Sequence, residues 1–362
     1  MLLFMVLPVA AIAYVAWHVW TMLPLGTWWK CAVIAAGVAA FLMLFVGLSG
    51  AMNRLPLPLA CTIYEIGTSS LIVLLYLFML FLLTDAARLL HIIPRQLLCH
   101  SWAATGTVAA LMVALFIGAN LHYRHKYRQP LELTTHKHLG RDYRFVMVSD
   151  LHLGYHNPRK ELARWVDLIN AEHADAILIA GDIIDISVRP LLEENMHEEF
   201  RRLNAPVYAC LGNHEYYSGS PGAQRFYSDA GISLLRDEAV VIDSAVTIIG
   251  RDDLTNKRRA TLSTIMNGAD PSTYIVVLDH QPYHLEKAEQ AGADLQFSGH
   301  THHGQVWPLS WITEHIYECA FGQHQRGNTH YYVSSGLGIW GGKFRIGTRS
   351  EYVVAEIRQS PR

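Results

Sequence analysis

Residues 144–152 read RFVMVSDLH, and the architecture of the second part of the chain can be inferred from them. The segment 144–149 is a short apolar run rich in Phe, Val and Met, which predicts a buried strand. Asp150 and His152, two side chains of the kinds that bind metal ions, follow directly. In open α/β sheets the ligand site lies just beyond the carboxyl ends of the strands. The stretch therefore predicts an α/β sheet with a site at this edge.

Four further predicted strands are each followed by side chains of the kinds that bind metal ions. They span 176–180, 207–211, 274–278 and 294–297. The polar residues that follow them are Asp182 and Asp185, Asn213 and His214, His280, and His300 and His302. Helical patterns are found over 159–171 and 191–203, and further strands near 239–242, 246–249, 331–334 and 352–356. The alternation of strands and helices predicts an α/β layered domain.

Seven of these side chains are candidate metal ligands, and together they offer carboxylate, amide and imidazole donors but no thiolate. They are Asp150, His152, Asp182, Asn213, His280, His300 and His302. This donor set suits Mn²⁺, Fe or Zn²⁺ and argues against a copper or iron–sulfur site. A single catalytic ion takes only three or four protein ligands, so seven predict two ions, about 3.5–4 Å apart and sharing one carboxylate. We expect two divalent ions, with Mn²⁺ favoured.

The order D-x-H, G-D-x-x-D, G-N-H-E, H and G-H-T-H resembles that of the calcineurin-like metallophosphoesterases, over about residues 144–357. The segment 299–305, GHTHHGQ, is similar to the GHTHGGQ of membrane-anchored or exported bacterial phosphohydrolases, with His303 in place of a glycine. The chain also resembles transmembrane proteins with a metallophosphoesterase domain. The resemblance implies a two-sheet sandwich flanked by helices.

The same resemblance implies a role for each site residue. Asp150, His152 and His302 would hold the first metal, Asn213, His280 and His300 the second, and Asp182 would bridge both. A metal-bridging hydroxide would attack the phosphorus. His214 would donate a proton to the leaving oxygen, and Asp185 would hold His214 in the required tautomer. A simpler alternative for Asp185 is a turn-capping residue.

The first third of the chain is a separate, apolar region. Residues 1–121 contain only six charged side chains: Lys30, Arg54, Glu65, Asp85, Arg88 and Arg95. Four uncharged runs lie between them, at 1–27, 31–53, 66–84 and 101–123. A membrane span needs about 20 residues, so these runs predict a four-span transmembrane domain over 1–121. No run contains a charge, which argues against an ion pathway.

We interpret residues 122–143 as a polar juxtamembrane connector whose basic start, Arg124 to Arg128, meets lipid headgroups. The catalytic domain would then occupy 144–362. With four spans, both termini would lie on the same side of the membrane. That side would carry Arg54, Arg124, Lys126 and Arg128, and the other side would carry Lys30, Arg88 and Arg95. This count leans towards a cytoplasmic catalytic domain. We expect an integral protein of a bacterial inner membrane.

The composition and a few single residues limit the partners and substrates that the chain could have. The formal net charge of −2 argues against a nucleic-acid partner, and five cysteines without a CxxC pair argue against a disulfide framework or zinc ribbon. Ile186 stands where the family's protein Ser/Thr phosphatases have an arginine, which weighs against a phosphoprotein substrate. Lys343, Arg345 and Arg349 could contact phosphate oxygens or have a surface role.

The apolar stretch 307–317 either contacts lipid or packs on the core as a hairpin and helix. With the membrane spans, it suggests a lipid-linked phosphodiester, phosphomonoester or pyrophosphate as substrate, with the bilayer as partner. One alternative, which the resemblance to this branch implies, is hydrolysis of the UDP-diacylglucosamine pyrophosphate bond in lipid A synthesis. The other is a non-catalytic, metal-binding membrane sensor.

Overall fold

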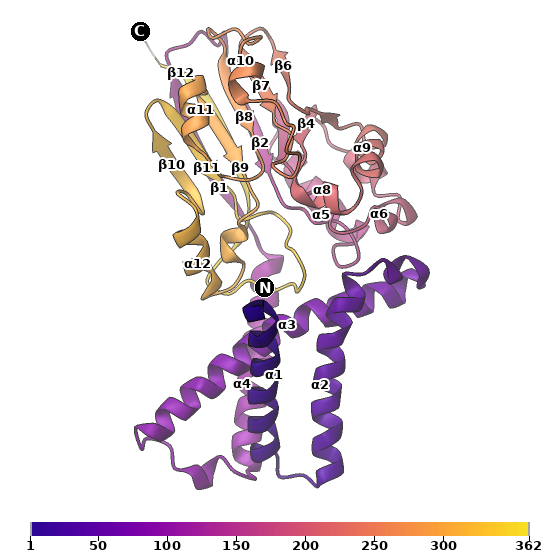
Figure 1. Cartoon of the computed structure of the whole chain (residues 1–362). Coiled ribbons are helices and arrows are strands. Elements are labelled where there is room, and N and C mark those ends of the chain that lie inside the picture. Colours follow the sequence, from indigo (N-terminus) through magenta and orange to yellow (C-terminus); the bar gives the residue numbers. More distant parts are fainter. Residues whose placement is uncertain (1, 361–362) are drawn as a thin grey trace. The chain divides into compact units, whose positions relative to one another are not determined.

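The computed structural model describes residues 2–360, with side chains from residue 8 onward, and it divides the chain into two compact units (Figure 1). The helical unit comprises residues 1–121 together with 341–343. The α/β unit comprises residues 122–340 together with 344–362. Residues 1, 361 and 362 and the side chains of 2–7 lie outside this description.

The helical unit contains four long helices and two short 3-10 turns. Their bounds are α1 Leu2–Met22, α2 Thr27–Gly47, η1 Gly50–Arg54, α3 Leu57–Leu89, η2 Arg95–Leu97 and α4 Trp102–Arg124. Among the described residues, α2, α3 and α4 are long and apolar enough to cross a membrane. Four spans were expected. The run 1–27 is helical as α1, but part of it lies outside the described side chains, so its membrane span stays a prediction.

Helix α3 is longer than the predicted run 66–84. Its 33 residues extend for about 50 Å, against about 30 Å for a hydrocarbon core. Glu65 and Asp85, expected to bracket the run, are therefore part of the helix. Apolar patterning detects only the uncharged middle of such a helix.

The α/β unit is built on two six-stranded sheets. The first has the order β1 Lys126–Thr135, β12 Ser350–Gln359, β2 Tyr143–Val148, β3 Ala176–Ala180, β4 Val207–Cys210, β5 Ser233–Leu234. The second has the order β10 Gly322–Arg326, β11 Thr329–Val333, β9 Leu295–Ser298, β8 Tyr274–Leu278, β7 Val246–Gly250, β6 Glu238–Ile242. Strands β2 to β5 are parallel, as are β7, β8, β9 and β11. Their carboxyl ends therefore meet at one edge of each sheet.

Successive side chains of a strand point to opposite faces of its sheet and so belong to different hydrophobic cores. In β2, Phe145 and Met147 join the core between the sheets, whereas Val146 and Val148 join the core under α5 (Arg159–Asn170). A third core lies beneath α10 (Leu262–Met266) and α11 (Glu286–Ala291) on the outer face of the second sheet. The predicted two-sheet sandwich flanked by helices is confirmed.

Part of the segment expected to be a connector is a strand. β1 pairs in parallel with β12 over ten residues and buries Leu131, Leu133 and Thr135 at alternate positions. Its partner lies more than 200 residues away along the chain, so local sequence gave little sign of it. Within the protein, Lys126 lies over the Tyr123 ring and Arg128 pairs with Glu172, while contact of this basic segment with lipid headgroups stays a prediction.

The helix predicted over 191–203 is instead two short helices, because Asn195 adopts a left-handed φ of 52° between them. They are α6 Arg189–Glu193 and α7 His197–Phe200. The remaining helices are α8 Asn213–Tyr217, α9 Ser220–Asp229, η3 His302–Gly304 and α12 Leu309–Ile316.

Candidate metal centre

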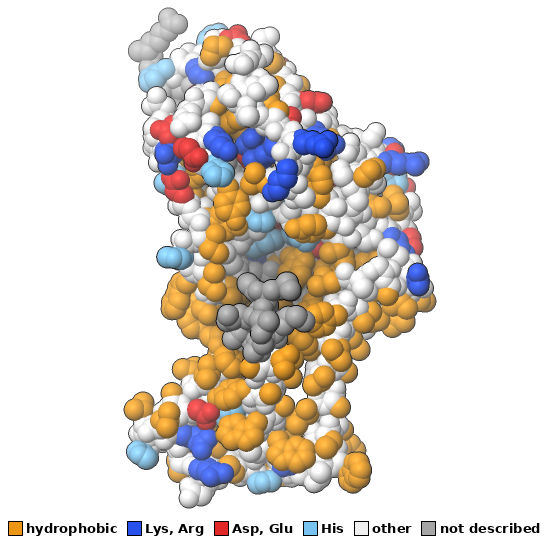
Figure 2. All heavy atoms as spheres, viewed as in Figure 1, with side chains coloured by type: hydrophobic (Ala, Val, Ile, Leu, Met, Phe, Trp, Pro, Cys, Tyr) orange, Lys and Arg blue, Asp and Glu red, His pale blue; other side chains and the backbone are white. Residues whose placement is uncertain are grey.

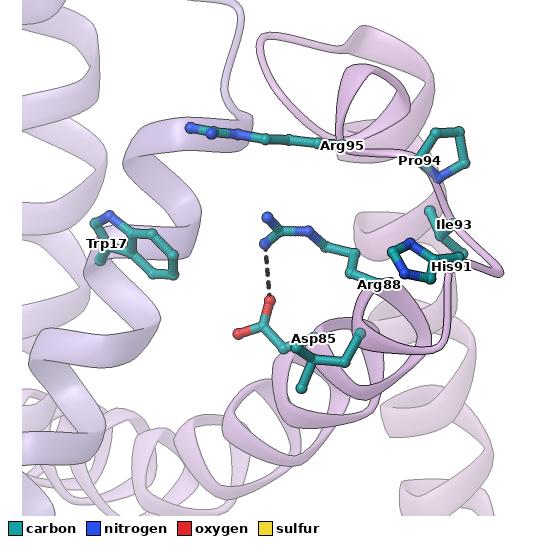
Figure 3. A pocket seen from close by; sticks show the side chains of 8 residues that line it. Trp17, Asp85, Arg88, His91, Ile93, Pro94 and Arg95 are labelled. Carbon is teal, nitrogen blue, oxygen red and sulfur yellow. Dashed lines mark hydrogen bonds and ion pairs between the residues drawn. The ribbon is translucent and has the colours of Figure 1, made fainter.

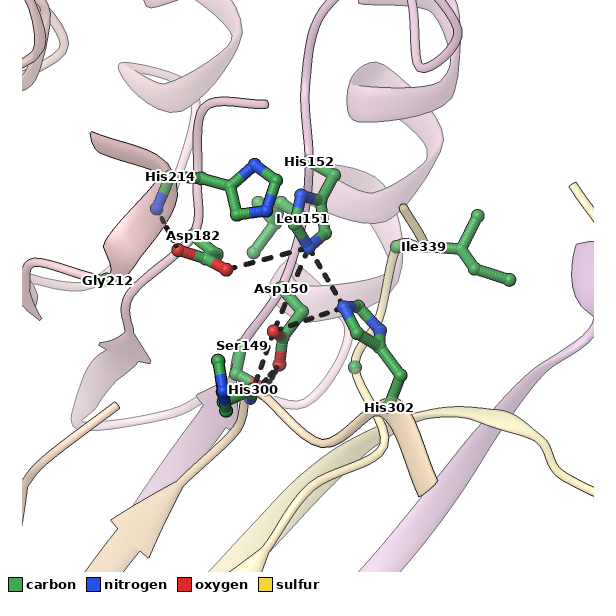
Figure 4. A network of polar contacts seen from close by, with 12 residues as sticks. Ser149, Asp150, Leu151, His152, Asp182, Gly212, His214, His300, His302 and Ile339 are labelled. Carbon is green, nitrogen blue, oxygen red and sulfur yellow. Dashed lines mark hydrogen bonds and ion pairs between the residues drawn. The ribbon is translucent and has the colours of Figure 1, made fainter. Parts of the chain in front are cut away.

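All nine predicted site residues meet at the carboxyl ends of the parallel strands. Asp150 and His152 follow β2, Asp182 and Asp185 follow β3, Asn213 and His214 open α8 after β4, His280 follows β8, and His300 and His302 follow β9. Figure 4 shows side chains from both sheets pointing towards one another here. The two sheets thus supply one shared site.

The first donor group comprises Asp150, His152 and His302. The Nε2 atoms of His152 and His302 lie 3.0 Å apart. Asp150 Oδ1 lies 3.8 Å from the first nitrogen and 3.5 Å from the second. Such spacing suits donors that share one cation, because metal–nitrogen bonds are about 2.1 Å long.

The second donor group comprises Asp182, His280 and His300. His280 Nε2 lies 3.1 Å from Asp182 Oδ2 and 3.2 Å from Asn213 Oδ1, which adds Asn213 to the group. The other nitrogen of the His280 ring, Nδ1, lies 2.8 Å from the carbonyl oxygen of Ala180, and this contact fixes the orientation of the ring.

Asp182 joins the two groups. Its Oδ2 atom, near His280, also lies 3.7 Å from His152 Nε2 in the first group. Its other oxygen, Oδ1, accepts a hydrogen bond of 2.9 Å from the backbone N–H of His214. One carboxylate oxygen therefore faces both donor groups, which is the position that a bridging ligand needs.

Asp185 is fully buried and lies among three histidines. Its Oδ1 atom is 3.2 Å from His214 Nδ1 and 3.4 Å from His152 Nδ1. Its Oδ2 atom is 3.6 Å from Nδ1 of His156. Sequence reasoning paired Asp185 with His214 alone and missed His156, which lies outside the motif spacings and is buried against the carbonyl of Ile339.

Burial and neighbouring charges set different protonation states for the histidines. Burial lowers the pKa of His300 to about 4 and holds that of His302 well below its usual value. Both rings are therefore neutral at physiological pH, the form that binds metals. Burial alone would also lower the pKa of His214, but Asp182 and Asp185 outweigh it and raise the pKa to about 9.

The backbone at the site is strained. Residues with a left-handed φ include Asp150 (53°), His152 (45°), Asp182 (53°), His300 (71°) and His302 (48°). Each such non-glycine residue costs about 1–3 kcal/mol, and such strain concentrates at functional sites. His303 shares the conformation, with φ of 50°, and stacks on Phe321 with ring centroids 4.5 Å apart. Its left-handed φ explains why related motifs have glycine there.

Two glycines let the backbone approach the carboxylates of Asp150 and Asp182. A Cβ atom on Gly212 would lie 2.1 Å from Asp182 Oδ1, and one on Gly299 would lie 2.2 Å from Asp150 Oδ2. No side chain fits at such distances. The glycines of the G-N-H-E and G-H-T-H motifs are thus required by close packing against the two carboxylates.

Glu215 supports the site from behind, a role that sequence reasoning did not assign although the residue belongs to the G-N-H-E motif. The side chain is fully buried and accepts hydrogen bonds from the backbone N–H groups of Asp182 (3.0 Å), Ile184 (3.0 Å) and Gly212 (2.7 Å). It therefore ties together the turns after β3 and β4.

We expect Glu215→Gln to destabilise the chain. The amide would turn its NH₂ group towards one of three backbone donors, at a cost of about 1–3 kcal/mol. The melting temperature of the full chain in detergent should fall by about 2–10 °C. Glu238→Gln, on exposed strand β6, is the matched control and should melt like the unmodified chain. Equal melting of the two variants would contradict the anchoring role.

The arginines considered as phosphate contacts have other partners. Arg345 is only 1% exposed and donates to the carbonyl oxygens of His302 (2.8 Å) and Gly338 (3.3 Å), so it holds the loop that carries His302. Arg349 pairs with Glu351 at 3.1 Å. Lys343 belongs to the helical unit.

The donors fit a pair of divalent cations. Among the described residues, three groups of carboxylate and imidazole atoms lie within 4.8 Å of one another. Two of them face the Asp182 carboxylate between them, and the third, of His152, Asp185 and His214, shares His152 with the first. The Nδ1 atom of His302 is buried without a hydrogen-bond partner among the described residues, and the ring's other nitrogen faces the first group. The neutral imidazoles of His300 and His302, together with the carboxylates of Asp150 and Asp182, are donors that suit divalent cations.

Comparison with known proteins matches this geometry to a family. Residues 143–304 match the family model described as calcineurin-like phosphoesterase. An uncharacterized metallophosphoesterase of Bacillus subtilis is 30% identical over 233 residues, which cover 58% of this chain and 82% of that protein. One of Campylobacter jejuni is 28% identical, over 61% of this chain and 60% of that protein.

A transmembrane protein with metallophosphoesterase domain from Danio rerio is 29% identical over 235 residues, covering 60% of this chain and 53% of that protein. The chain thus spans less than two thirds of the length of several relatives. The Bacillus match covers most of that protein, and the family model covers the strands that carry the two donor groups. This chain therefore belongs to the calcineurin-like metallophosphoesterase family.

Proposed function

We propose that this protein is a metal-dependent phosphohydrolase of a membrane. The observation that carries the proposal is the placement of Asp182 between two donor groups, with His214 beside it. Two divalent cations held there, for which we propose Mn²⁺, would neutralise phosphate charge and lower the pKa of water to about 7. Asp150, His152 and His302 would hold one, Asn213, His280 and His300 the other, and Asp182 both.

In this proposal His214 protonates the leaving oxygen. Its Nδ1 lies 3.1 Å from the carbonyl oxygen of Asp185 and 3.2 Å from its carboxylate, so Nδ1 carries a proton towards Asp185. Its Nε2 atom has no hydrogen bond to any described residue, and the side chain is 13% exposed. Nε2 can therefore give a proton to the substrate, while Asp185 fixes the ring.

A water-soluble phosphodiester tests the activity itself. We expect the full chain, purified in detergent and loaded with Mn²⁺, to hydrolyse bis(p-nitrophenyl) phosphate, and chelation to abolish the reaction. Inactivity of the metal-loaded chain towards phosphodiesters, phosphomonoesters and pyrophosphates would instead support a non-catalytic sensor. The intact pair of His214 and Asp185 weighs against that alternative.

Helix α12 supports a lipid-linked substrate. It begins seven residues after His302 and leaves Trp311 62%, Ile312 55% and Ile316 55% exposed. Hydrophobic side chains gather over the region where Figure 1 places α12 (Figure 2). An apolar helix face beside the donors is suited to an acyl chain or the membrane interface. We place the catalytic unit at the cytoplasmic face of a bacterial inner membrane, following the count of basic residues.

Trp311→Ser should reduce the preference for lipid substrates. We expect the ratio of kcat/KM for a phosphatidic acid in mixed micelles to that for bis(p-nitrophenyl) phosphate to fall about tenfold, because the variant removes most of a large apolar contact. Leu192→Ser, exposed on α6, is the matched control and should leave the ratio unchanged. If both variants give the original ratio, α12 does not contact the substrate's lipid.

A further inference from the structure

A cavity lined by both charged and apolar side chains lies in the helical unit, at the carboxyl end of α3. It has a volume of about 520 Å³ and is lined by Trp17, Asp85, Arg88, Leu89, His91, Ile93, Pro94 and Arg95. Figure 3 shows the side chains of Arg88 and Arg95 extending into the space opposite Trp17. None of its lining residues belongs to the unit that holds the metal centre.

The acidic residue of the cavity is satisfied from within the protein. Asp85 accepts a hydrogen bond of 2.7 Å from the hydroxyl of Tyr14, and its Oδ2 lies 3.0 Å from His18 Nε2. Its Oδ1 accepts from Arg88 Nη1 at 2.9 Å. His18 is fixed in turn by stacking on Phe81, with ring centroids 4.6 Å apart. The carboxylate therefore needs no further cation.

The two arginines carry more positive charge than Asp85 neutralises. Arg88 uses one guanidinium nitrogen on Asp85, and its other N–H donors have no partner among the described residues. The guanidinium of Arg95 forms no hydrogen bond or ion pair with any described residue, although its backbone carbonyl accepts from Leu98 and Cys99. Since Asp85 offsets only one of them, the cavity has a net positive charge and several free donors. That arrangement selects an anion with several oxygen atoms.

The surroundings of the cavity are apolar and exposed. Leu89 is 80% exposed and Ile92 is 69% exposed, while Leu97 and Trp17 also present apolar surface. Exposed aliphatic side chains beside arginines at the end of a membrane helix are suited to the boundary between headgroups and acyl chains. An amphiphilic anion satisfies both parts of this surface, the arginines with its charged end and the aliphatic side chains with its chains.

We propose that this cavity binds the phosphate group of an anionic phospholipid between Arg88 and Arg95. Guanidinium groups bind phosphate through paired N–H···O hydrogen bonds, and the lipid's chains cover Leu89 and Ile92. This site is separate from the metal centre and does not depend on the proposed hydrolase activity. Its role is lipid recognition by the helical unit.

The test measures lipid binding to the full chain in detergent by native mass spectrometry. We expect dioleoylphosphatidylglycerol to bind in preference to dioleoylphosphatidylcholine, and Arg95→Gln to weaken phosphatidylglycerol binding about tenfold. Arg95 is exposed and its guanidinium is unpaired among the described residues, so its replacement should not disturb folding. Arg54→Gln, also exposed but in η1, is the matched control and should bind like the unmodified chain.

A second arm identifies the source of the phosphate. Inorganic phosphate at millimolar concentration should not displace phosphatidylglycerol if the lipid chains contribute to binding. Displacement by phosphate, with the Arg95 dependence retained, would support a phosphate site but overturn its assignment to a lipid. Equal binding of the two lipids, or equal effects of Arg95→Gln and Arg54→Gln, would overturn the site itself. Hydrolysis of bis(p-nitrophenyl) phosphate is measured separately, so failure of one proposal leaves the other testable.

Discussion

Asp182→Asn should abolish both metal binding and phosphodiester hydrolysis. Oδ2 of Asp182 lies 3.1 Å from His280 Nε2 and 3.7 Å from His152 Nε2, between the two donor groups. The amide removes the negative charge there. If its oxygen keeps the hydrogen bond from the His214 N–H, its NH₂ group must face the histidine nitrogens.

The expected loss is large because one residue serves both cation positions. Changes to residues that only surround a metal's ligands cost about 10- to 100-fold in affinity or activity. We expect the loss of a shared ligand to exceed this, with a fall in kcat/KM of about 10³-fold or more, or about 4 kcal/mol of transition-state stabilisation. Metal content per chain, measured by plasma mass spectrometry after dialysis, should fall from two towards zero.

Asp142→Asn is the matched control, since Asp142 is exposed and precedes β2 at the end of the strand away from the site. It should retain two metals and full activity. Retention of both metals by Asp182→Asn would show that the shared carboxylate is not a metal ligand. The bridging role would then be wrong even if the activity were lost.

His214→Gln should separate chemistry from metal binding. His214 contacts Asp185 through Nδ1 and is not a member of either group assigned to a cation. We therefore expect two metals per chain to remain, while kcat falls by about 10² to 10⁴-fold, the usual contribution of a general acid. The loss should grow with the pKa of the leaving group, being smaller for p-nitrophenol than for an alkyl alcohol.

The leaving-group series is the decisive readout. A purely structural effect of His214→Gln would lower all rates by the same factor, whereas loss of a proton donor penalises poor leaving groups most. His136→Gln, at an exposed histidine in the turn after β1, should behave like the unmodified chain. Loss of metal from the His214 variant would reassign this histidine as a ligand.

Helix boundaries and β1 show where sequence reasoning was insufficient. Strands such as 144–149 and 176–180 were predictable because both faces are buried and the residues 145–148 and 176–180 are all apolar. β1 was not, because half of its residues face solvent and its ladder forms with β12, far along the chain. The break in the helix expected over 191–203 depends on one left-handed residue, Asn195, among strong helix formers.

The sequence alone determined the donor types and their order, because each ligand follows an apolar strand and the carboxyl ends of parallel strands meet at one edge. It also set the division between an apolar helical part and an α/β part, which composition reports directly. Only the tertiary structure decided that Asp185 serves three histidines, that Glu215 ties two turns together and that Arg345 is buried behind His302. These relations join residues from separate turns and loops, and spacing along a chain carries no information on such contacts until both sheets have formed.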